Sequence, residues 1–236
     1  MTTSKTRQAR WMAALAAVVM VGSAQAVPVA GQGTWDDPVL GLQGRDLDGN
    51  AANGPEAFYD TVLDITWLRD MNYAKTSGFD SDGRMHWTTA KAWATNLVYG
   101  GFSDWRLPTA LNADGSGPCG GRFGSLGCTG SEMGHLWYVD LGNPAFGPMS
   151  NTGDFQNLQS LEYWTGTVYA PDPNIPAWLF DTRDGRQAAW DDHFTVKNAM
   201  AVRSGDVVAV IPEPQTYAML LAGLGVLAVM RRRRQG

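Results

Sequence analysis

The chain has 236 residues, with 18 basic and 23 acidic side chains and a formal net charge of −5. The first 26 and last 26 residues hold seven of the basic residues and one glutamate, so residues 27–210 carry 11 basic and 22 acidic side chains, a net charge of −11. This acidic body argues against phosphate-backbone recognition, and no nucleic-acid partner is expected. It is long enough for one domain with its own core.

The first 26 residues have the zones of a secretory signal peptide. A head with three basic residues precedes the uncharged apolar run 11–21, and Ala24 and Ala26 frame a small-x-small cleavage motif. An apolar helix of this length spans about 16 Å, well short of a hydrocarbon core of about 30 Å. We therefore expect signal peptidase to cleave after Ala26 and the rest of the chain to be exported.

The last 26 residues contain an ordered series of features. Pro212, Glu213 and Pro214 precede the mostly apolar stretch 215–230, and the stop-transfer cluster follows directly: Arg231, Arg232, Arg233 and Arg234. The apolar stretch reaches about 24 Å as a helix, which is short for a membrane span. An ordinary C-terminal membrane anchor is the alternative interpretation.

Residues 212–234 resemble the PEP-CTERM sorting signal. The resemblance implies that an exosortase, a membrane cysteine protease-like enzyme, recognises Pro212-Glu213-Pro214 and that the apolar helix is removed after transient anchoring in the inner membrane. Such tails accompany proteins of the cell envelope, the outer surface or the exopolysaccharide matrix. The expected partners during processing are signal peptidase and the exosortase.

The first part of the body predicts few regular elements. Residues 27–57 are rich in Gly, Asp, Asn and Pro, which is typical of a loose segment with a short edge strand near residues 39–42. The alternation of Leu63, Ile65 and Trp67 with polar residues predicts a half-buried strand. Residues 87–97 have helical spacing, with Thr88 or Thr89 as the N-cap and Gly100-Gly101 as the stop.

The second part predicts one more helix and then strands. Thr129 and Glu132 have the spacing of a capping box, before a helix that Asn143-Pro144 ends. Strands are expected at residues 162–169, 177–181, 187–190 and 199–203, with turn residues between them. Two helices followed by short antiparallel strands predict an α+β fold, not a doubly wound sheet.

Both cysteines, Cys119 and Cys128, lie in the exported body and flank a glycine-rich loop. Because the compartment outside the cytoplasm is oxidising, a disulfide between them is the favoured interpretation. A zinc site is the alternative, but His135 is the only further ligand nearby in sequence.

Several sequence runs resemble the C-terminal domain of a collagen-like adhesin (Lcl C-terminal), and the match covers residues 58–206 of a domain expected at 58–210. The runs are Ile65-Thr66-Trp67-Leu68-Arg69-Asp70, the alanine-rich run 87–97 with Trp93, Gly100-Gly101-Phe102-Ser103-Asp104-Trp105-Arg106-Leu107-Pro108-Thr109, Tyr163-Trp164-Thr165-Gly166-Thr167, Ala177-Trp178 and Ala201-Val202-Arg203. The resemblance implies a compact domain related to the C-type lectin-like fold, found on exported bacterial proteins and in adhesins, with no general enzymatic activity. Many members place cysteines in the first helix and near the final strand. This chain has Ser204 at the second place, so no family disulfide is carried over.

The family motif is expected to stabilise the fold and not to touch a ligand. Its residues are Trp67, Asp104, Trp105, Arg106, Leu107, Pro108 and Arg203. Asp104 is expected to accept hydrogen bonds from the backbone or from Arg106. Arg203 is a candidate partner for a buried acid such as Asp104.

Nine of the ten tryptophans lie in the body. Exposed tryptophans stack on sugar rings, so a carbohydrate-binding surface has four candidate residues: Trp137, Trp164, Trp178 and Trp190. The alternative is that these side chains fill the core.

We expect neither a metal ion nor a cofactor, and a bound calcium ion is the alternative. Asp46-Leu47-Asp48-Gly49-Asn50 and Asp80-Ser81-Asp82-Gly83 begin like calcium loops, but Ala51, Ala57 and Arg84 occupy required positions, and turns are the favoured interpretation. The histidines, His86, His135 and His193, are solitary in sequence. The run Asp191-Asp192-His193 could contribute ligands to a metal site or supply a general base. The alternative is that it is a solvated cluster at the end of a strand.

No nucleophile elbow, phosphate loop or dinucleotide fingerprint occurs in the sequence. We therefore expect a secreted, non-catalytic adhesion or binding module of the cell surface or matrix, with a polysaccharide as its ligand. An enzyme that processes envelope polymers and a passive structural matrix protein are the alternatives.

Overall fold

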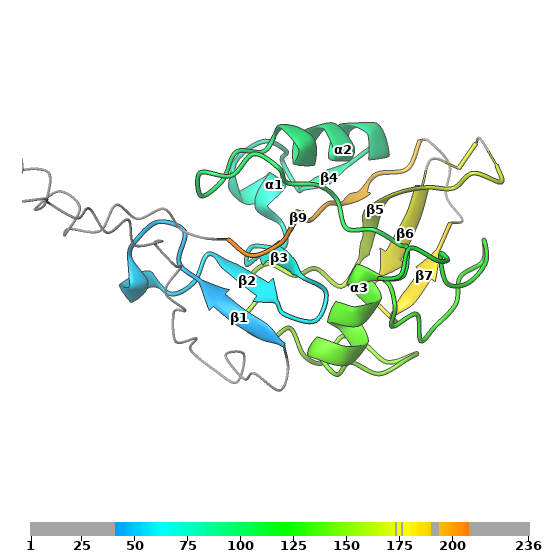
Figure 1. Cartoon of the computed structure of the whole chain (residues 1–236). Helices are drawn as coiled ribbons and strands as arrows, with labels where there is room; N and C mark the ends of the chain where they lie inside the picture. The colour runs from blue at the N-terminus through cyan, green and yellow to red at the C-terminus, as the bar shows by residue number, and fades with distance from the viewer. Residues whose placement is uncertain (1–40, 173, 176, 190–193, 208–236) are drawn as a thin grey trace, which may run out of the picture.

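The computed structural model describes residues 41–172, 174–175, 177–189 and 194–207. The expected signal peptide, the PEP-CTERM tail, Trp190 and the run Asp191-Asp192-His193 lie outside these residues. Within the described part the protein combines two sheets with short helices, so the expected α+β class is confirmed (Figure 1).

The first sheet is antiparallel and brings together the two ends of the described chain. Its strand order is β1 (Leu42–Arg45), β2 (Ala57–Asp60), β3 (Ile65–Leu68) and β9 (Val202–Ser204). Arg45 in β1 is buried and forms an ion pair of 2.7 Å with Asp206, which follows β9. This contact and the β3–β9 pairing close the domain.

The second sheet is mixed. Its order is β4 (Arg84–Met85), β8 (Lys197–Asn198), β5 (Glu162–Val168), β6 (Ala177–Asp181) and β7 (Arg186–Ala188). Strands β5 and β8 are parallel, and the other pairs are antiparallel.

The helices are short and lie at different edges of the sheets. They comprise η2 (Ala51–Asn53), α1 (Tyr73–Thr76), α2 (Trp87–Asn96) and α3 (Glu132–His135), which continues directly as a π-helical turn, η3 (Leu136–Asp140). In Figure 1, α2 lies beside α1 at one end of the molecule, and α3 lies beside the first sheet at the other.

Two apolar clusters form most of the core. One contains Phe58 and Trp67 of the first sheet with Met133 and Leu136 from α3 and η3. The other packs Trp93 of α2 with buried side chains that include Trp105, Trp164, Leu107 and Leu179. Each buried side chain of this size contributes about 1.5–3 kcal/mol relative to an exposed one.

The helix caps differ from those predicted. Helix α2 begins at Trp87 after His86, so Thr88 and Thr89 lie inside its first turn and do not cap it. The N-cap of α3 is Ser131, not Thr129, because the Ser131 hydroxyl accepts the Gly134 N–H at 3.2 Å.

The strands also differ in detail. The edge strand expected at residues 39–42 shares only Leu42 with the observed strand β1 (Leu42–Arg45), which lies within the segment predicted to be loose. Asp64 has a φ of 53°, so β3 begins only at Ile65, and all four of its residues are buried because both faces of the strand are covered. Of the strand expected at 199–203, only residues 202 and 203 form a strand, as part of β9, and β8 lies just before the expected range.

Candidate functional site

The Arg106 side chain, in the run 100–109, joins two distant segments. Its guanidinium donates to both carboxylate oxygens of Glu132, at 2.7 and 2.8 Å, and the Thr109 N–H donates to the same carboxylate at 2.7 Å. Glu132 is 7% exposed and is the first residue of α3. Arg106 therefore holds Glu132 and not Asp104, the acceptor considered from the sequence.

Asp104 is instead paired with Arg203. The Arg203 guanidinium donates to both Asp104 oxygens, at 2.8 and 2.9 Å, and lies 4.4 Å from the centre of the Phe102 ring. These hydrogen bonds lower the pKa of Asp104 below its usual value. The Asp104 side chain is 57% exposed, which corrects the expectation that the acid of this pair is buried.

The remaining motif residues belong to the core or to its backbone connections. Trp67, Trp105 and Leu107 are buried. The Pro108 carbonyl accepts the Gly166 N–H at 2.7 Å, so the turn after the motif is held against β5. These contacts support the interpretation that the motif stabilises the fold.

The two most distinctive sequence runs also line one surface groove of about 400 Å³, which we call the motif groove. The run 100–109 and the run 163–167 both contribute to it, as does α2; its lining residues are Lys91, Thr95, Arg106, Leu107, Thr109, Leu111, Gly166 and Thr167. The hydroxyls of Thr109 and Thr167 lie 2.9 Å apart.

Trp87 does not line the motif groove but contacts one of its residues, Lys91. It lies one helical turn before Lys91, whose Nζ is 5.2 Å from the centre of the indole ring. The indole N–H donates to the Thr165 carbonyl at 2.9 Å, next to Gly166 of the groove. Trp87 is half-buried. It was not among the tryptophans proposed from the sequence to bind a ligand.

Three of the four tryptophans proposed to bind a ligand are core residues. Trp137, Trp164 and Trp178 are 2%, 0% and 6% exposed, so they present no ring face to a ligand, and that interpretation is corrected. The indole N–H of Trp164 donates to the Met85 carbonyl at 2.8 Å. Trp190 lies outside the described residues.

The structure contains the disulfide between Cys119 and Cys128. The loop that it closes pairs with β7, since Ser125 and Gln187 exchange two backbone hydrogen bonds. The buried Gln187 side chain donates to the Cys119 carbonyl at 3.0 Å. The disulfide therefore fixes a loop against the edge of the second sheet.

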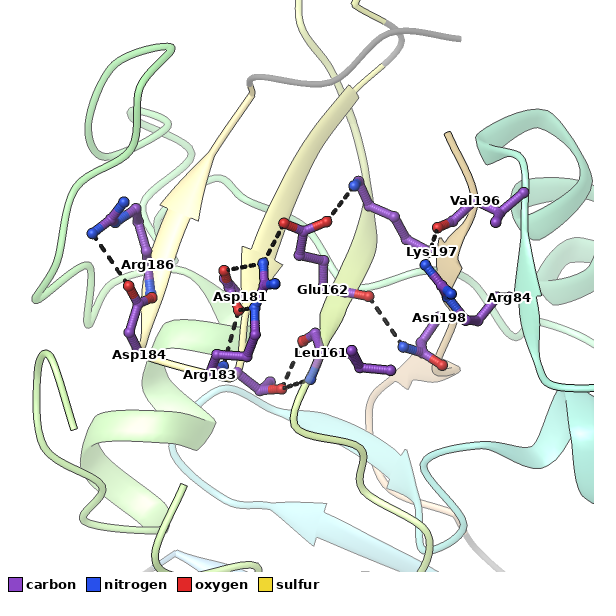
Figure 2. Close-up of polar contacts among 11 residues, drawn as sticks. Arg84, Leu161, Glu162, Asp181, Arg183, Asp184, Arg186, Val196, Lys197 and Asn198 are labelled. Atoms are coloured by element: carbon purple, nitrogen blue, oxygen red, sulfur yellow. Dashed lines mark hydrogen bonds and ion pairs between the residues drawn. The ribbon is translucent and has the colours of Figure 1, made fainter. Parts of the chain in front are cut away.

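A charged network crosses the second sheet, as Figure 2 shows. The Glu162 carboxylate on β5 accepts hydrogen bonds from Lys197 on β8 and from Arg183, which also binds Asp181 at the end of β6. Lys197 is buried, and its charge lies 5.2 Å from the centre of the Trp164 ring. Because these charged groups pair with one another, we infer that the network holds the strands of the second sheet in register.

The two calcium-like runs form turns. Asp46 Oδ1 accepts the N–H groups of residues 48, 49 and 50, and Asp80 Oδ1 accepts those of residues 82 and 83. Ligand atoms of Asp46, Asp48 and Glu56 nevertheless lie within 4.8 Å of one another at the surface. This acidic group is explained by its local hydrogen bonds.

His135 is not solitary in space. It lies with Asp60 and Asp140, and one ligand atom from each side chain lies within 4.8 Å of the others. The residues are 8%, 0% and 3% exposed. Burial, with a further contribution from Asp60, raises the pKa of Asp140 to about 8. Sequence reasoning missed Asp60 and Asp140, which no motif connects to His135. His86, by contrast, is exposed, with its Nδ1 3.2 Å from the Thr195 carbonyl.

Comparison with known families identifies one match: residues 210–234 match the PEP-CTERM protein-sorting motif. The protein is therefore an exported, envelope-associated protein targeted by an exosortase. No curated protein and no solved structure matches the chain. Among the described residues, no helix has the length and apolar character needed to cross a membrane.

Proposed function

We propose that this exported protein is a non-catalytic binding module of the cell surface or exopolysaccharide matrix and that it binds polysaccharide at the motif groove. The carrying observation is the PEP-CTERM match, because it directs the chain to the compartment where such polymers are found. The expected relationship to C-type lectin-like adhesin domains is part of the same proposal.

The chemistry of the groove supports a sugar ligand. Threonine hydroxyls and the Lys91 ammonium supply donors and acceptors for sugar hydroxyls. The half-buried Trp87, which contacts Lys91, adds aromatic surface beside the groove. An apolar surface with a few polar groups is typical of small-ligand sites. The bidentate Arg106–Glu132 pair holds one wall of the groove in place.

The test is equilibrium binding of the exported protein to purified matrix polysaccharide of the producing cells, with and without calcium. We expect saturable binding that weakens about tenfold in Trp87→Ala and in Lys91→Ala, which corresponds to about 1.4 kcal/mol. Phe123→Ala is the matched control, because Phe123 is an aromatic residue with 80% exposure outside the groove.

The same experiment separates the alternatives. A binding module leaves the length of the polysaccharide chains unchanged, whereas a polymer-processing enzyme shortens or alters them. A passive matrix protein shows no saturable ligand. Either of these outcomes, or equal losses in Trp87→Ala and Phe123→Ala, contradicts the proposal.

A further inference from the structure

We propose that Asp60, His135 and Asp140 form a buried site for a divalent transition-metal ion such as Zn²⁺, which connects the β2–β3 turn to α3 and η3. This site shares no residue with the motif groove. The proposal therefore does not depend on the proposed binding function.

Unpartnered polar atoms converge at this place. Among the described residues, eight buried side-chain nitrogen or oxygen atoms have no hydrogen-bond partner, and four of them belong to this cluster: Asp60 Oδ2, His135 Nε2, Asp140 Oδ1 and Asp140 Oδ2. The His135 Nε2 to Asp140 Oδ1 distance is 3.6 Å, which is longer than a hydrogen bond. Burying such groups without partners is costly, and a cation satisfies all of them together.

A π-helical turn lies between His135 and Asp140. In a regular α-helix, residues five apart point about 140° away from each other. Here the Leu141 N–H donates to the Leu136 carbonyl, five residues earlier, at 2.9 Å. The wider turn brings His135 and Asp140 to the same side. Such turns are frequent at functional sites because they re-aim side chains.

The orientation of Asp60 supports the same site. Its Oδ1 accepts the Val62 and Leu63 N–H groups, each at 2.9 Å, in the turn that follows β2. Oδ2 is thereby directed to the cluster. A ligating carboxylate whose other oxygen is hydrogen-bonded is the usual arrangement at metal sites.

The ligand set selects the class of ion. Calcium and magnesium take oxygen ligands, whereas one imidazole nitrogen and two carboxylate oxygens suit Zn²⁺ and related first-row ions. Zinc bonds these atoms at about 2.0–2.2 Å in a tetrahedral arrangement, so two of its ligand atoms lie about 3.4 Å apart. The His135 Nε2 to Asp140 Oδ1 distance of 3.6 Å is already close to this value. The other ligand separations, all within 4.8 Å, would shorten by at most about 1.4 Å when the ion binds.

The test uses the full exported protein, stripped with a chelator and then loaded with Zn²⁺ or Co²⁺. We expect one tightly held ion per chain by elemental analysis and a visible absorption band of coordinated Co²⁺. At a free Zn²⁺ concentration a hundred times the dissociation constant, the melting temperature should rise by roughly 5–10 °C.

Matched variants identify the site. Asp140→Asn and His135→Gln should lose the Co²⁺ band and the shift in melting temperature, while His86→Gln and Asp46→Asn should keep both. Because Asp140→Asn keeps the shape of the side chain, its far-ultraviolet circular dichroism shows that loss of metal is not loss of folding. A wild-type melting temperature that neither Zn²⁺ nor chelator changes, or Co²⁺ binding retained by His135→Gln, overturns the proposal.

Discussion

Arg106 and Glu132 form a bidentate ion pair that joins the motif run 100–109 to the first residue of α3. The Glu132 carboxylate is nearly buried and also holds the Thr109 N–H. Removing Arg106 would leave the Glu132 carboxylate buried without two of its three hydrogen bonds. Such an unpaired buried charge destabilises the folded state.

Replacing Arg106 by alanine should therefore lower the free energy of unfolding by about 2–3 kcal/mol, because Glu132 loses two charged hydrogen bonds. Urea unfolding at neutral pH measures this loss. Asp104→Asn is the matched comparison, since it breaks the exposed ion pair with Arg203 and should cost less than about 1 kcal/mol. Equal losses in the two variants would show that burial of Glu132 does not matter.

The Asp104–Arg203 pair should give a small dependence of stability on pH. Hydrogen bonds from Arg203 lower the pKa of Asp104 from its ordinary value of 3.8, so the folded state favours the carboxylate. The contribution is present above that ordinary value and is lost as the pH falls through the lower pKa of the folded state. Because Asp104 is largely exposed, we expect at most about 1 kcal/mol. The difference in unfolding free energy between wild type and Asp104→Asn should shrink from pH 7 to pH 2.5, and a difference that grows would contradict this.

Trp164→Ala should lower the free energy of unfolding by about 3–5 kcal/mol, because the ring is fully buried and its N–H is bonded to Met85. Trp164→Phe keeps much of the ring and should cost less. Polysaccharide binding by folded Trp164→Phe should equal that of wild type. If folded Trp164→Phe lost polysaccharide binding, Trp164 would be part of the ligand-binding surface.

The sequence predicted best those elements whose pattern is local. Residues 177–181 became β6, and the helix expected at 87–97 is α2 (Trp87–Asn96). Strands β4 and β8 have two residues each, too few to show a period. β2 follows directly after a Gly- and Asn-rich segment, and its strand form depends on pairing with β1 and β3. Those pairings are tertiary and leave no local signal.

The candidate sites show the same division. The motif runs could be identified in sequence, but the groove that they share appears only when β5 is folded against the motif. Asp60 and His135 are far apart in the chain, and the spacing of His135 and Asp140 suits no ordinary helix. Tryptophan content alone could not separate the buried Trp137 and Trp164 from the half-exposed Trp87, because neighbours in space decide burial.

The disulfide gives a further prediction. Mass spectrometry of the exported protein without reduction should show the peptides of Cys119 and Cys128 linked. Closing a loop of this length stabilises a protein by about 2–3 kcal/mol in the chain-entropy treatment. The double variant Cys119→Ala/Cys128→Ala should unfold at correspondingly lower urea concentrations. Free thiols in the exported protein would contradict the pairing.

The central claim is that an exosortase sorts this protein, and the intact mass of the protein from producing cells tests it most directly. The account predicts a mature chain that lacks residues 1–26 and has been cut near Pro212-Glu213-Pro214, so that Arg231, Arg232, Arg233 and Arg234 are gone. Cells without the exosortase should retain the tail. A mature chain that keeps the tail in cells with an active exosortase would contradict the claim.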